Sequence, residues 1–203
     1  MGLSGQNYGE ITEKDGYLIF SFALENEEYV TGGIPEKFLP VPWGERLYLI
    51  PVKGIINFCN EINSRWEPRK GQYGFFFLKR EDWMKEVQGQ PEIPEQFRPY
   101  LLEEPVAAAI IDIVKIETNS SSTLKRAIVR IDKGKKDGLL PGMELQVIKS
   151  GVVFTEITLV EVDETQSQGF YYIYPRRTLL EGQVWEQEPQ VGWNVSTCPS
   201  WRR

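Results

Sequence analysis

The sequence of 203 residues contains no histidine. Histidine is the general base of serine and cysteine hydrolases, a frequent ligand of zinc and the usual pH switch near neutrality. The composition therefore excludes sites of these three kinds within one chain. Catalysis would have to depend on carboxylate, lysine or tyrosine side chains, and we expect neither a cofactor nor a metal site.

Basic residues are few and scattered. The chain carries 23 Lys and Arg against 29 Asp and Glu, which gives a formal net charge of -6. Attachment to nucleic acid or to an anionic membrane surface requires a concentrated excess of positive charge. The compact basic runs, at Lys133 to Lys136, Arg176–Arg177 and Arg202–Arg203, are typical of solvated turns and chain ends. We therefore expect no nucleic-acid partner.

Long apolar runs are also missing. The best candidate, Val106 to Val114, has about half of the roughly 18 residues that a membrane-spanning helix needs, and it contains Asp112. The sequence therefore predicts no membrane span.

Cysteine is limited to Cys59 and Cys198, which are too few for a disulfide framework and too far apart for a metal-binding knuckle. Cys59 falls on the apolar face of a predicted helix, where a free cysteine behaves as a small hydrophobic residue. We expect a reduced, buried Cys59. A disulfide to Cys198 stays open as the alternative in an oxidising compartment.

A glycine-rich segment from Asp132 to Met143 separates two alternating strand patterns. Gly134, Gly138 and Gly142 suit a loop that needs positive φ or close backbone approach. The run from Leu140 to Met143 fits a type II turn, because Pro141 fixes φ at the second position and a glycine follows it. The segment predicts a strand-loop-strand unit and carries no catalytic group.

The last hundred residues favour strands and predict a small antiparallel β-barrel over residues 105–203. Alternation gives each strand one inner face, as in Ala127, Val129 and Ile131. In the longest expected strand the alternation of apolar residues shifts by one position, because Ile157 and Leu159 are odd-numbered and Val160 and Val162 are even-numbered. This shift predicts a β-bulge or bend near Leu159. The expected strands are Val106–Glu117, Leu124–Asp132, Met143–Lys149, Val152–Asp163, Gln168–Tyr174, Gln183–Gln187 and Val191–Thr197.

Residues 1–104 predict a small α+β domain, so the fold class is α+β and mostly β. Strands are expected at Gly16–Leu24, Glu45–Ile50 and Tyr73–Leu78, with an irregular connection through Pro40–Pro42. Pro51 is placed for the first turn of a helix. The apolar stripe of that helix comprises Val52, Ile55, Ile56, Cys59 and Ile62, and its polar side comprises Lys53, Asn57, Asn60 and Ser64. A short helix is expected from Glu95 to Leu102.

Two Trp-x-x-Arg groups flank the helix, at Trp43 with Arg46 and at Trp66 with Arg69. An arginine over an indole gives a cation-π contact of about 0.5 to 2 kcal/mol. One interpretation is a structural clasp between the two loops. The other is an aromatic and guanidinium platform for a sugar, a peptide or a carboxylate.

Asparagines on the helix complete the candidate ligand-binding set. Asn63 falls on the apolar stripe, where an unpaired amide costs about 1 to 3 kcal/mol. It could cap the helix in the left-handed conformation, pin the loop from Arg65 to Arg69, or face a ligand. The candidate residues are therefore Trp43, Arg46, Asn60, Asn63, Trp66 and Arg69.

Paired carboxylates offer the best enzymatic alternative, because a glycosidase of this type needs no histidine. The adjacent acids Glu81–Asp82, Glu103–Glu104 and Glu161 to Glu164 have no distinctive environment in the sequence. We expect them to be solvated surface residues.

The residues Gly134-Lys-Lys-Asp-Gly-Leu-Leu-Pro-Gly-Met143, followed by Gly151 and Val160-Glu-Val-Asp163, resemble a bacterial pattern. Roughly residues 125–190 are similar to the C-terminal β-barrel of the flagellar assembly protein FlgT and, more loosely, to the β domains of MreC. These are envelope proteins that assemble with partners and catalyse nothing. The stretches Trp43–Ile50 and Phe58–Arg69 resemble an uncharacterised bacterial protein family.

The sequence thus predicts a non-enzymatic binding or assembly module with a protein partner. The resemblance implies a periplasmic or envelope location, and a cytoplasmic one stays open. The alternative function is a carbohydrate-binding or carboxylate-dependent glycan-active protein, which would use the Trp and Arg loops.

Overall fold

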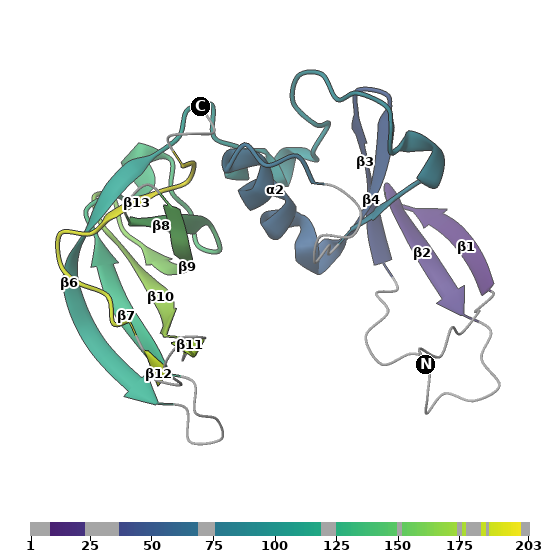
Figure 1. Ribbon diagram of the computed structural model, residues 1–203. Helices are drawn as coiled ribbons and strands as arrows, with labels where there is room; N and C mark the ends of the chain where they lie inside the picture. The colour runs from purple at the N-terminus through teal and green to yellow at the C-terminus, as the bar shows by residue number, and fades with distance from the viewer. Residues whose placement is uncertain are drawn as a thin grey trace. The chain divides into compact units, whose positions relative to one another are not determined.

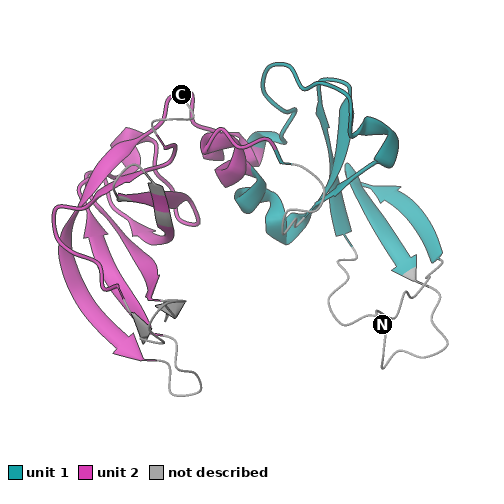
Figure 2. Cartoon of the chain, in the orientation of Figure 1, with its two compact units in different colours: residues 1–58, 68–95 teal, residues 59–67, 96–203 magenta. Residues whose placement is uncertain are grey.

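The computed structural model describes residues 9–22, 37–68, 76–118, 125–149, 152–173, 176–177, 184–185 and 187–199. The chain forms two compact units (Figure 2), and each is built mainly from antiparallel strands. Unit 1 comprises Met1–Phe58 and Pro68–Glu95, and unit 2 comprises Cys59–Glu67 and Gln96–Arg203. The helix Ile55–Asn63 contributes to both units, because the first division falls between Phe58 and Cys59. The sequence instead predicts one boundary, between residues 104 and 105.

Unit 1 contains a five-stranded sheet in the order β1-β2-β3-β4-β5. Its strands are β1 (Gly9–Lys14), β2 (Tyr17–Phe22), β3 (Lys37–Trp43), β4 (Arg46–Pro51) and β5 (Phe77–Leu78). Figure 1 labels the first four of these strands. The predicted strands at Gly16–Leu24 and Glu45–Ile50 correspond to β2 and β4. Of the predicted strand Tyr73–Leu78, only β5 and Phe76 belong to the described residues.

The predicted irregular connection through Pro40 and Pro42 is wrong, because β3 runs through both prolines. Pro40 pairs with Leu49 of β4, and Pro42 pairs with Leu47. Because the two prolines are two residues apart, their backbone polar groups lie on the same side of β3. The Glu92 N–H donates to the Pro42 carbonyl at 2.8 Å, which shows that this side faces away from β4. A proline lacks a backbone N–H. At these two positions the hydrogen bonds between β3 and β4 do not use the N–H of β3, so the prolines do not interrupt the pairing.

The predicted helix begins after Pro51 as η1 (Val52–Gly54) and continues as α2 (Ile55–Asn63). Its Phe58 packs in unit 1 against Trp43, Tyr48 and Phe76, with ring centroids 5.3 to 6.2 Å apart. Cys59 and Asn60, in unit 2, are also buried. The predicted polar side is therefore wrong at Asn60 and Ser64, which are buried because this end of the helix packs within unit 2. The shorter helices are η2 (Arg80–Asp82), η3 (Glu95–Tyr100) and η4 (Lys135–Asp137).

Unit 2 contains the predicted barrel, which closes in the order β10-β7-β6-β13-β8-β9 with antiparallel neighbours (Figure 1). Its strands are β6 (Ala107–Thr118), β7 (Lys125–Ile131), β8 (Glu144–Lys149), β9 (Val152–Val162), β10 (Ser167–Ile173) and β13 (Asn194–Ser196). A separate two-stranded sheet pairs β11 (Arg176–Arg177) with β12 (Val184–Trp185). The barrel core includes Val129, Leu145, Ile157 and Tyr171, which are fully buried. The alternation seen in the sequence therefore identifies the inner faces.

The glycine-rich segment forms the predicted turns. Gly142 has φ 89°, and the Met143 N–H donates to the Leu140 carbonyl at 3.2 Å, as a type II turn requires. Gly134 meets the backbone of the turn after β9, because an added Cβ would lie 2.3 Å from the Asp163 carbonyl oxygen. The predicted bulge is present as well, since Val160 is skipped in the pairing of β9 with β10.

Candidate functional site

The first Trp-x-x-Arg group is buried inside unit 1. The Trp43 side chain donates from Nε1 to the Gly89 carbonyl at 2.9 Å. Arg46 is 6% exposed, and it donates from Nε to the Lys85 carbonyl at 2.6 Å and from Nη1 to the Tyr48 hydroxyl at 3.1 Å. Both side chains hold the segment 85–89 against the sheet. The geometry favours a structural clasp here over an open platform.

The structure describes only part of the second group. Trp66 belongs to unit 2, where 37% of its surface is exposed, and Arg69 lies outside the described residues. The clasp partners of Trp43 and Arg46 come instead from the segment after η2. Sequence reasoning missed these partners because they are backbone carbonyls, which leave no residue-type signal.

The two candidate asparagines each bind backbone groups of unit 2. Asn60 donates from Nδ2 to the Gly142 carbonyl at 3.0 Å, and its Oδ1 accepts from the Glu144 N–H at 3.2 Å. Asn63 donates to the Tyr100 carbonyl and accepts from the Leu102 N–H, each at 2.9 Å. These side chains attach the end of α2 to the turn before β8 and to the chain after η3.

The predicted cap at Asn63 is wrong in position. Arg65 takes the left-handed conformation, with φ 56°, and the Trp66 N–H donates to the Glu61 carbonyl at 2.9 Å. This hydrogen bond and the left-handed residue form a Schellman motif, a common helix C-terminus. The left-handed residue is Arg65, two residues after the predicted Asn63. The Asn63 amide is thereby available for Tyr100 and Leu102, and it does not pin the loop from Arg65 to Arg69.

Three glutamates that the sequence does not single out form an acidic cluster on unit 2: Glu61 of α2, Glu144 of β8 and Glu156 of β9. Gln146 pairs directly with Glu156, and it lies two residues from Glu144 on the same strand. Because side chains alternate along a strand, these three residues share the outer face of the barrel, while Leu145 and Val147 fill its core. The Asn60 contact with β8 brings the adjacent Glu61 to this face.

The environment of the acidic cluster disfavours negative charge. Burial, together with the charges of Glu156 and Glu61, raises the pKa of Glu144 to about 7. Burial also raises the pKa of Glu61 to about 7, and Glu156 is the second cause. Among the described residues, no lysine or arginine lowers either pKa. The cluster is therefore a site of unbalanced negative potential.

Gln146 adds a buried acceptor beside these carboxylates. Gln146 is 8% exposed, and among the described residues its Oε1 has no hydrogen-bond partner. A buried carbonyl oxygen without a donor costs about 1 to 3 kcal/mol. Such groups are uncommon in folded proteins, and an acceptor of this kind can bind a water molecule, an ion or a donor group of a ligand.

The adjacent acids named from the sequence behave differently. Glu81, Glu103, Glu104, Glu161, Asp163 and Glu164 are exposed. Asp82 is buried and accepts from Lys85 Nζ at 2.7 Å and from the Leu47 N–H at 3.1 Å. The hydrogen bond from Lys85 lowers the Asp82 pKa, so this carboxylate is a balanced structural group. Except for Asp82, the expectation of solvated surface acids is confirmed.

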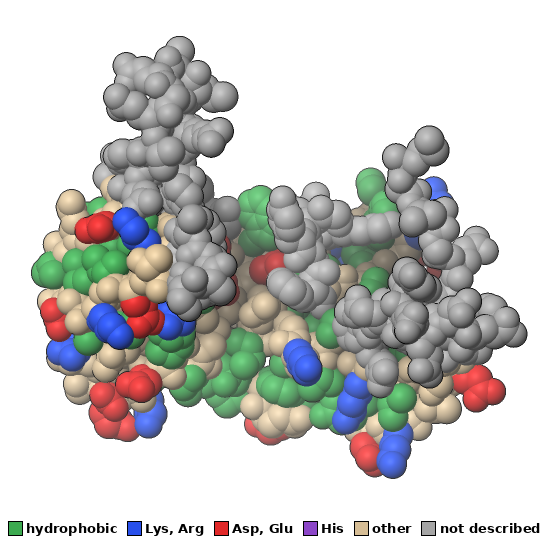
Figure 3. All heavy atoms as spheres, turned by 90° about the horizontal axis from the view of Figure 1, so that it is seen from below, with side chains coloured by type: hydrophobic (Ala, Val, Ile, Leu, Met, Phe, Trp, Pro, Cys, Tyr) green, Lys and Arg blue, Asp and Glu red, His purple; other side chains and the backbone are tan. Residues whose placement is uncertain are grey.

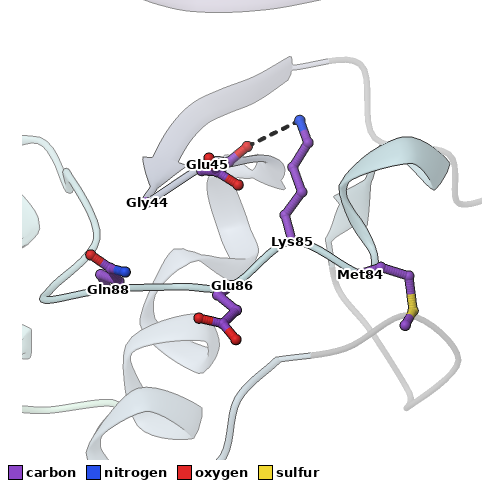
Figure 4. A pocket seen from close by; sticks show the side chains of 6 residues that line it. All are labelled: Gly44, Glu45, Met84, Lys85, Glu86 and Gln88. Carbon is purple, nitrogen blue, oxygen red and sulfur yellow. Dashed lines mark hydrogen bonds between the residues drawn. The ribbon is translucent and has the colours of Figure 1, made fainter.

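An open hollow of about 520 Å³ lies beside the clasp in unit 1 (Figure 4). Its lining residues are Gly44, Glu45, Met84, Lys85, Glu86 and Gln88. Lys85 Nζ reaches the Glu45 carbonyl at 3.4 Å across it (Figure 4). The Met84 side chain stands at its rim and is 93% exposed.

The described residues contain neither a cluster of metal ligands nor a helix that could span a membrane. No group of three or more cysteine, aspartate and glutamate side chains in this part of the chain is placed to hold a metal ion. None of the described helices has the length and apolar character to cross a membrane. On the face drawn in Figure 3, basic and acidic side chains of described residues are interspersed, without a continuous basic field.

Both cysteines are buried and neither belongs to a disulfide, which confirms the expectation of a reduced, buried Cys59. Burial raises the pKa of the Cys59 thiol to about 12. The Cys198 thiol contacts the Ser64 carbonyl at 3.5 Å. A thiol of such high pKa is a poor nucleophile, so Cys59 is a packing residue.

Comparison of the chain with protein-family models, with curated proteins and with solved structures finds no match.

Proposed function

We propose that the chain is a non-enzymatic binding or assembly module of the bacterial cell envelope. The observation that carries the binding role is an apolar edge on unit 1, formed by Phe77, Trp83 and Met84. These side chains are 55%, 36% and 93% exposed, respectively. The resemblance of residues 125–190 to the FlgT barrel supports the envelope location.

The apolar edge has the composition and position of a protein-binding surface. β5 has two residues and lies at the end of the sheet order. The Trp83 indole donates to the Leu78 carbonyl at 3.4 Å, which keeps it beside β5, and Phe77 packs edge-on against Phe38 at 5.5 Å. Aromatic residues and methionine are enriched in interfaces, and methionine adapts its shape to a partner.

Site-specific crosslinking tests this proposal. A photoreactive amino acid in place of Met84 should give a discrete adduct with one partner protein in the bacterial host. The same probe in place of Lys53, which is exposed on η1 of the same unit, should give none. Equal labelling from both positions, or none from position 84, would contradict a binding role for the apolar edge.

The purified partner then permits a quantitative measurement. Met84→Asp places a charge in the interface and should weaken binding by at least tenfold in calorimetry, while Lys53→Asp should change it little. Fractionation of the host cells tests the compartment. Recovery of the chain only with cytoplasmic proteins would replace the envelope location by the cytoplasmic alternative.

A glycan-active function is the second candidate, and the acidic cluster is the observation that favours it. A glycosidase needs one carboxyl of raised pKa as the acid and a second carboxylate that stays ionised. Glu144 or Glu61 could serve as the acid beside the exposed Glu156. Release of reducing ends from envelope polysaccharides by the wild type, and its loss in Glu144→Gln, would establish this function in place of the first.

A further inference from the structure

We propose that the acidic cluster and Gln146 form a binding site for a cationic side-chain group, an ammonium or a guanidinium from a basic segment of the partner. The inference rests on the proposed binding function and identifies one chemical feature of the partner. It concerns unit 2 alone and does not require the apolar edge of unit 1.

The position of the four side chains supports a site with a floor and a rim. Gln146 is the most buried of them, Glu61 and Glu144 are partly buried, and Glu156 is exposed. Three separate elements supply the carboxylates, and the two backbone hydrogen bonds of Asn60 fix α2 against β8. The acceptors are therefore held in place before a ligand arrives, which reduces the entropy lost on binding.

The unpaired Gln146 Oε1 is a second and independent indication of a ligand. It is an acceptor, as are ionised carboxylates, so each of the four side chains can supply an acceptor oxygen. The β13 residue that pairs with Gln146 is Ser196, which is uncharged and donates instead to the Cys198 carbonyl at 2.8 Å. A group that carries several N–H donors would complete this arrangement.

An organic cation fits the site better than a metal ion. The carboxylates in the described residues do not converge closely enough to hold a metal. A guanidinium carries five N–H donors in a fixed plane and an ammonium carries three, so each can bind acceptors that are spread more widely. A cation would also neutralise the unbalanced charge of Glu61, Glu144 and Glu156.

The binding should be linked to protons. From α2, β8 and β9, the titratable groups that face the site are Glu61, Glu144 and Glu156, and β13 adds no charge. A cation requires the ionised carboxylates, whereas burial keeps Glu61 and Glu144 protonated until the pH passes about 7. Affinity should therefore rise as the pH increases from 6 to 8, and the bound cation should displace protons.

The experiment is an NMR titration of the full chain at pH 8 with three acetylated tripeptide amides that differ at the central residue: arginine, lysine or citrulline. Citrulline has the shape of arginine without its charge. We expect saturable shifts of the Gln146 side-chain amide with arginine or lysine and none with citrulline. Equal shifts with citrulline, or shifts only with calcium ions, would overturn the proposal.

Matched variants locate the site. Glu144→Gln and Glu61→Gln should each weaken peptide binding by at least tenfold, while Glu161→Gln, an exposed change of equal charge on β9, should leave it unchanged. The first two variants remove repulsion and should melt at higher temperature than the wild type at pH 8, so lost binding cannot be attributed to unfolding. Equal weakening by Glu161→Gln would show a diffuse charge effect and refute the site.

The two proposals fail separately. If the titration shows no cation binding but the Met84 crosslink persists, the binding module stands and the acidic site is wrong. If Glu144→Gln loses the peptide while the Met84 probe forms no adduct, the cation site stands and the apolar edge is wrong.

Discussion

Unit 1 and unit 2 use the same antiparallel pairing but end it differently. The sheet of unit 1 stops at β1 and β5, whereas the six strands of unit 2 close on one another. An open sheet leaves backbone groups and apolar side chains at its edges, and closure removes such edges. Exposed aromatic and methionine side chains accordingly occur beside β5. In unit 2 the proposed recognition groups are polar side chains on the outer face of a closed barrel.

The units also differ in how they hold an adjoining segment. In unit 1, Arg46 and Trp43 donate to carbonyls of the segment 85–89. In unit 2, the Asn60 and Asn63 amides each donate once and accept once. An amide satisfies both backbone groups of a passing chain, while an arginine satisfies only acceptors. Four of the predicted ligand-binding residues therefore have structural partners.

The largest effect is expected from a glycine that the closed barrel requires. Gly134→Ala would place a Cβ 2.3 Å from the Asp163 carbonyl oxygen and 2.7 Å from the Gln166 nitrogen. These are backbone atoms that cannot rotate away, so we expect unit 2 to lose about 3 kcal/mol. Gly192→Ala is the control, because φ is +87° there and no atom lies within 4 Å. It should cost about 1 kcal/mol. Denaturant unfolding measures both, and equal losses would refute the close approach.

A smaller effect should come from pH, and it should be confined to unit 2. Glu61 and Glu144 have folded-state pKa values of about 7, above their ordinary value of 4.5. Raised values mean that stability is fully present below pH 4.5 and is lost as the pH rises through 7. The two groups interact, so we expect a joint loss of about 2 kcal/mol between pH 5 and pH 8.

Hydrogen exchange of amides assigned to each unit can measure this loss. Protection in β7 and β8 should fall between pH 5 and pH 8, after correction for the intrinsic rate, and Glu144→Gln should reduce the fall by about half. Glu161→Gln should not. An equal fall in β3 and β4 would show that the effect does not come from the acidic cluster.

The barrel could be predicted from the sequence because its signals are local. Alternation identified the inner faces, and the phase change in the longest strand predicted a bulge near Leu159, and the bulge lies at Val160. β1 could not be predicted, because all six of its residues are exposed and no apolar face distinguishes it. β3 was not predicted, because Pro40 and Pro42 usually exclude a strand. A proline is tolerated only where its missing N–H would not pair with a neighbouring strand, and the sequence does not show which positions these are.

The acidic cluster could not be predicted for a different reason. Its members are separated by up to 95 residues, from Glu61 to Glu156, and each alone has the pattern of an ordinary surface residue. Glu144 and Glu156 alternate with core residues, as outer-face residues do, and Glu61 follows the polar Asn60. The contact of Asn60 with Gly142 and Glu144 brings Glu61 to the paired strands β8 and β9, and such a contact leaves no trace in spacing. The alternation of Glu144 and Gln146 with core residues does show in the sequence that these two side chains share the outer face of one strand.

The smallest effect compares the Arg46 contacts of unit 1 with the Asn60 contacts of unit 2. Arg46→Ala leaves the Lys85 carbonyl without its donor and removes one partner of the Tyr48 hydroxyl, which still donates to the Pro68 carbonyl at 3.1 Å. Asn60→Ala leaves both the Gly142 carbonyl and the Glu144 N–H unpaired. We expect a loss of about 1 kcal/mol for Arg46→Ala and a loss somewhat larger for Asn60→Ala, each in its own unit. Asn57→Ala, on the same helix, is the control and should change stability by less than about 0.5 kcal/mol. If Arg46→Ala instead abolished partner binding and left the exchange of segment 85–89 unchanged, Arg46 would belong to a binding platform, and the comparison of Arg46 with Asn60 as structural residues would be refuted.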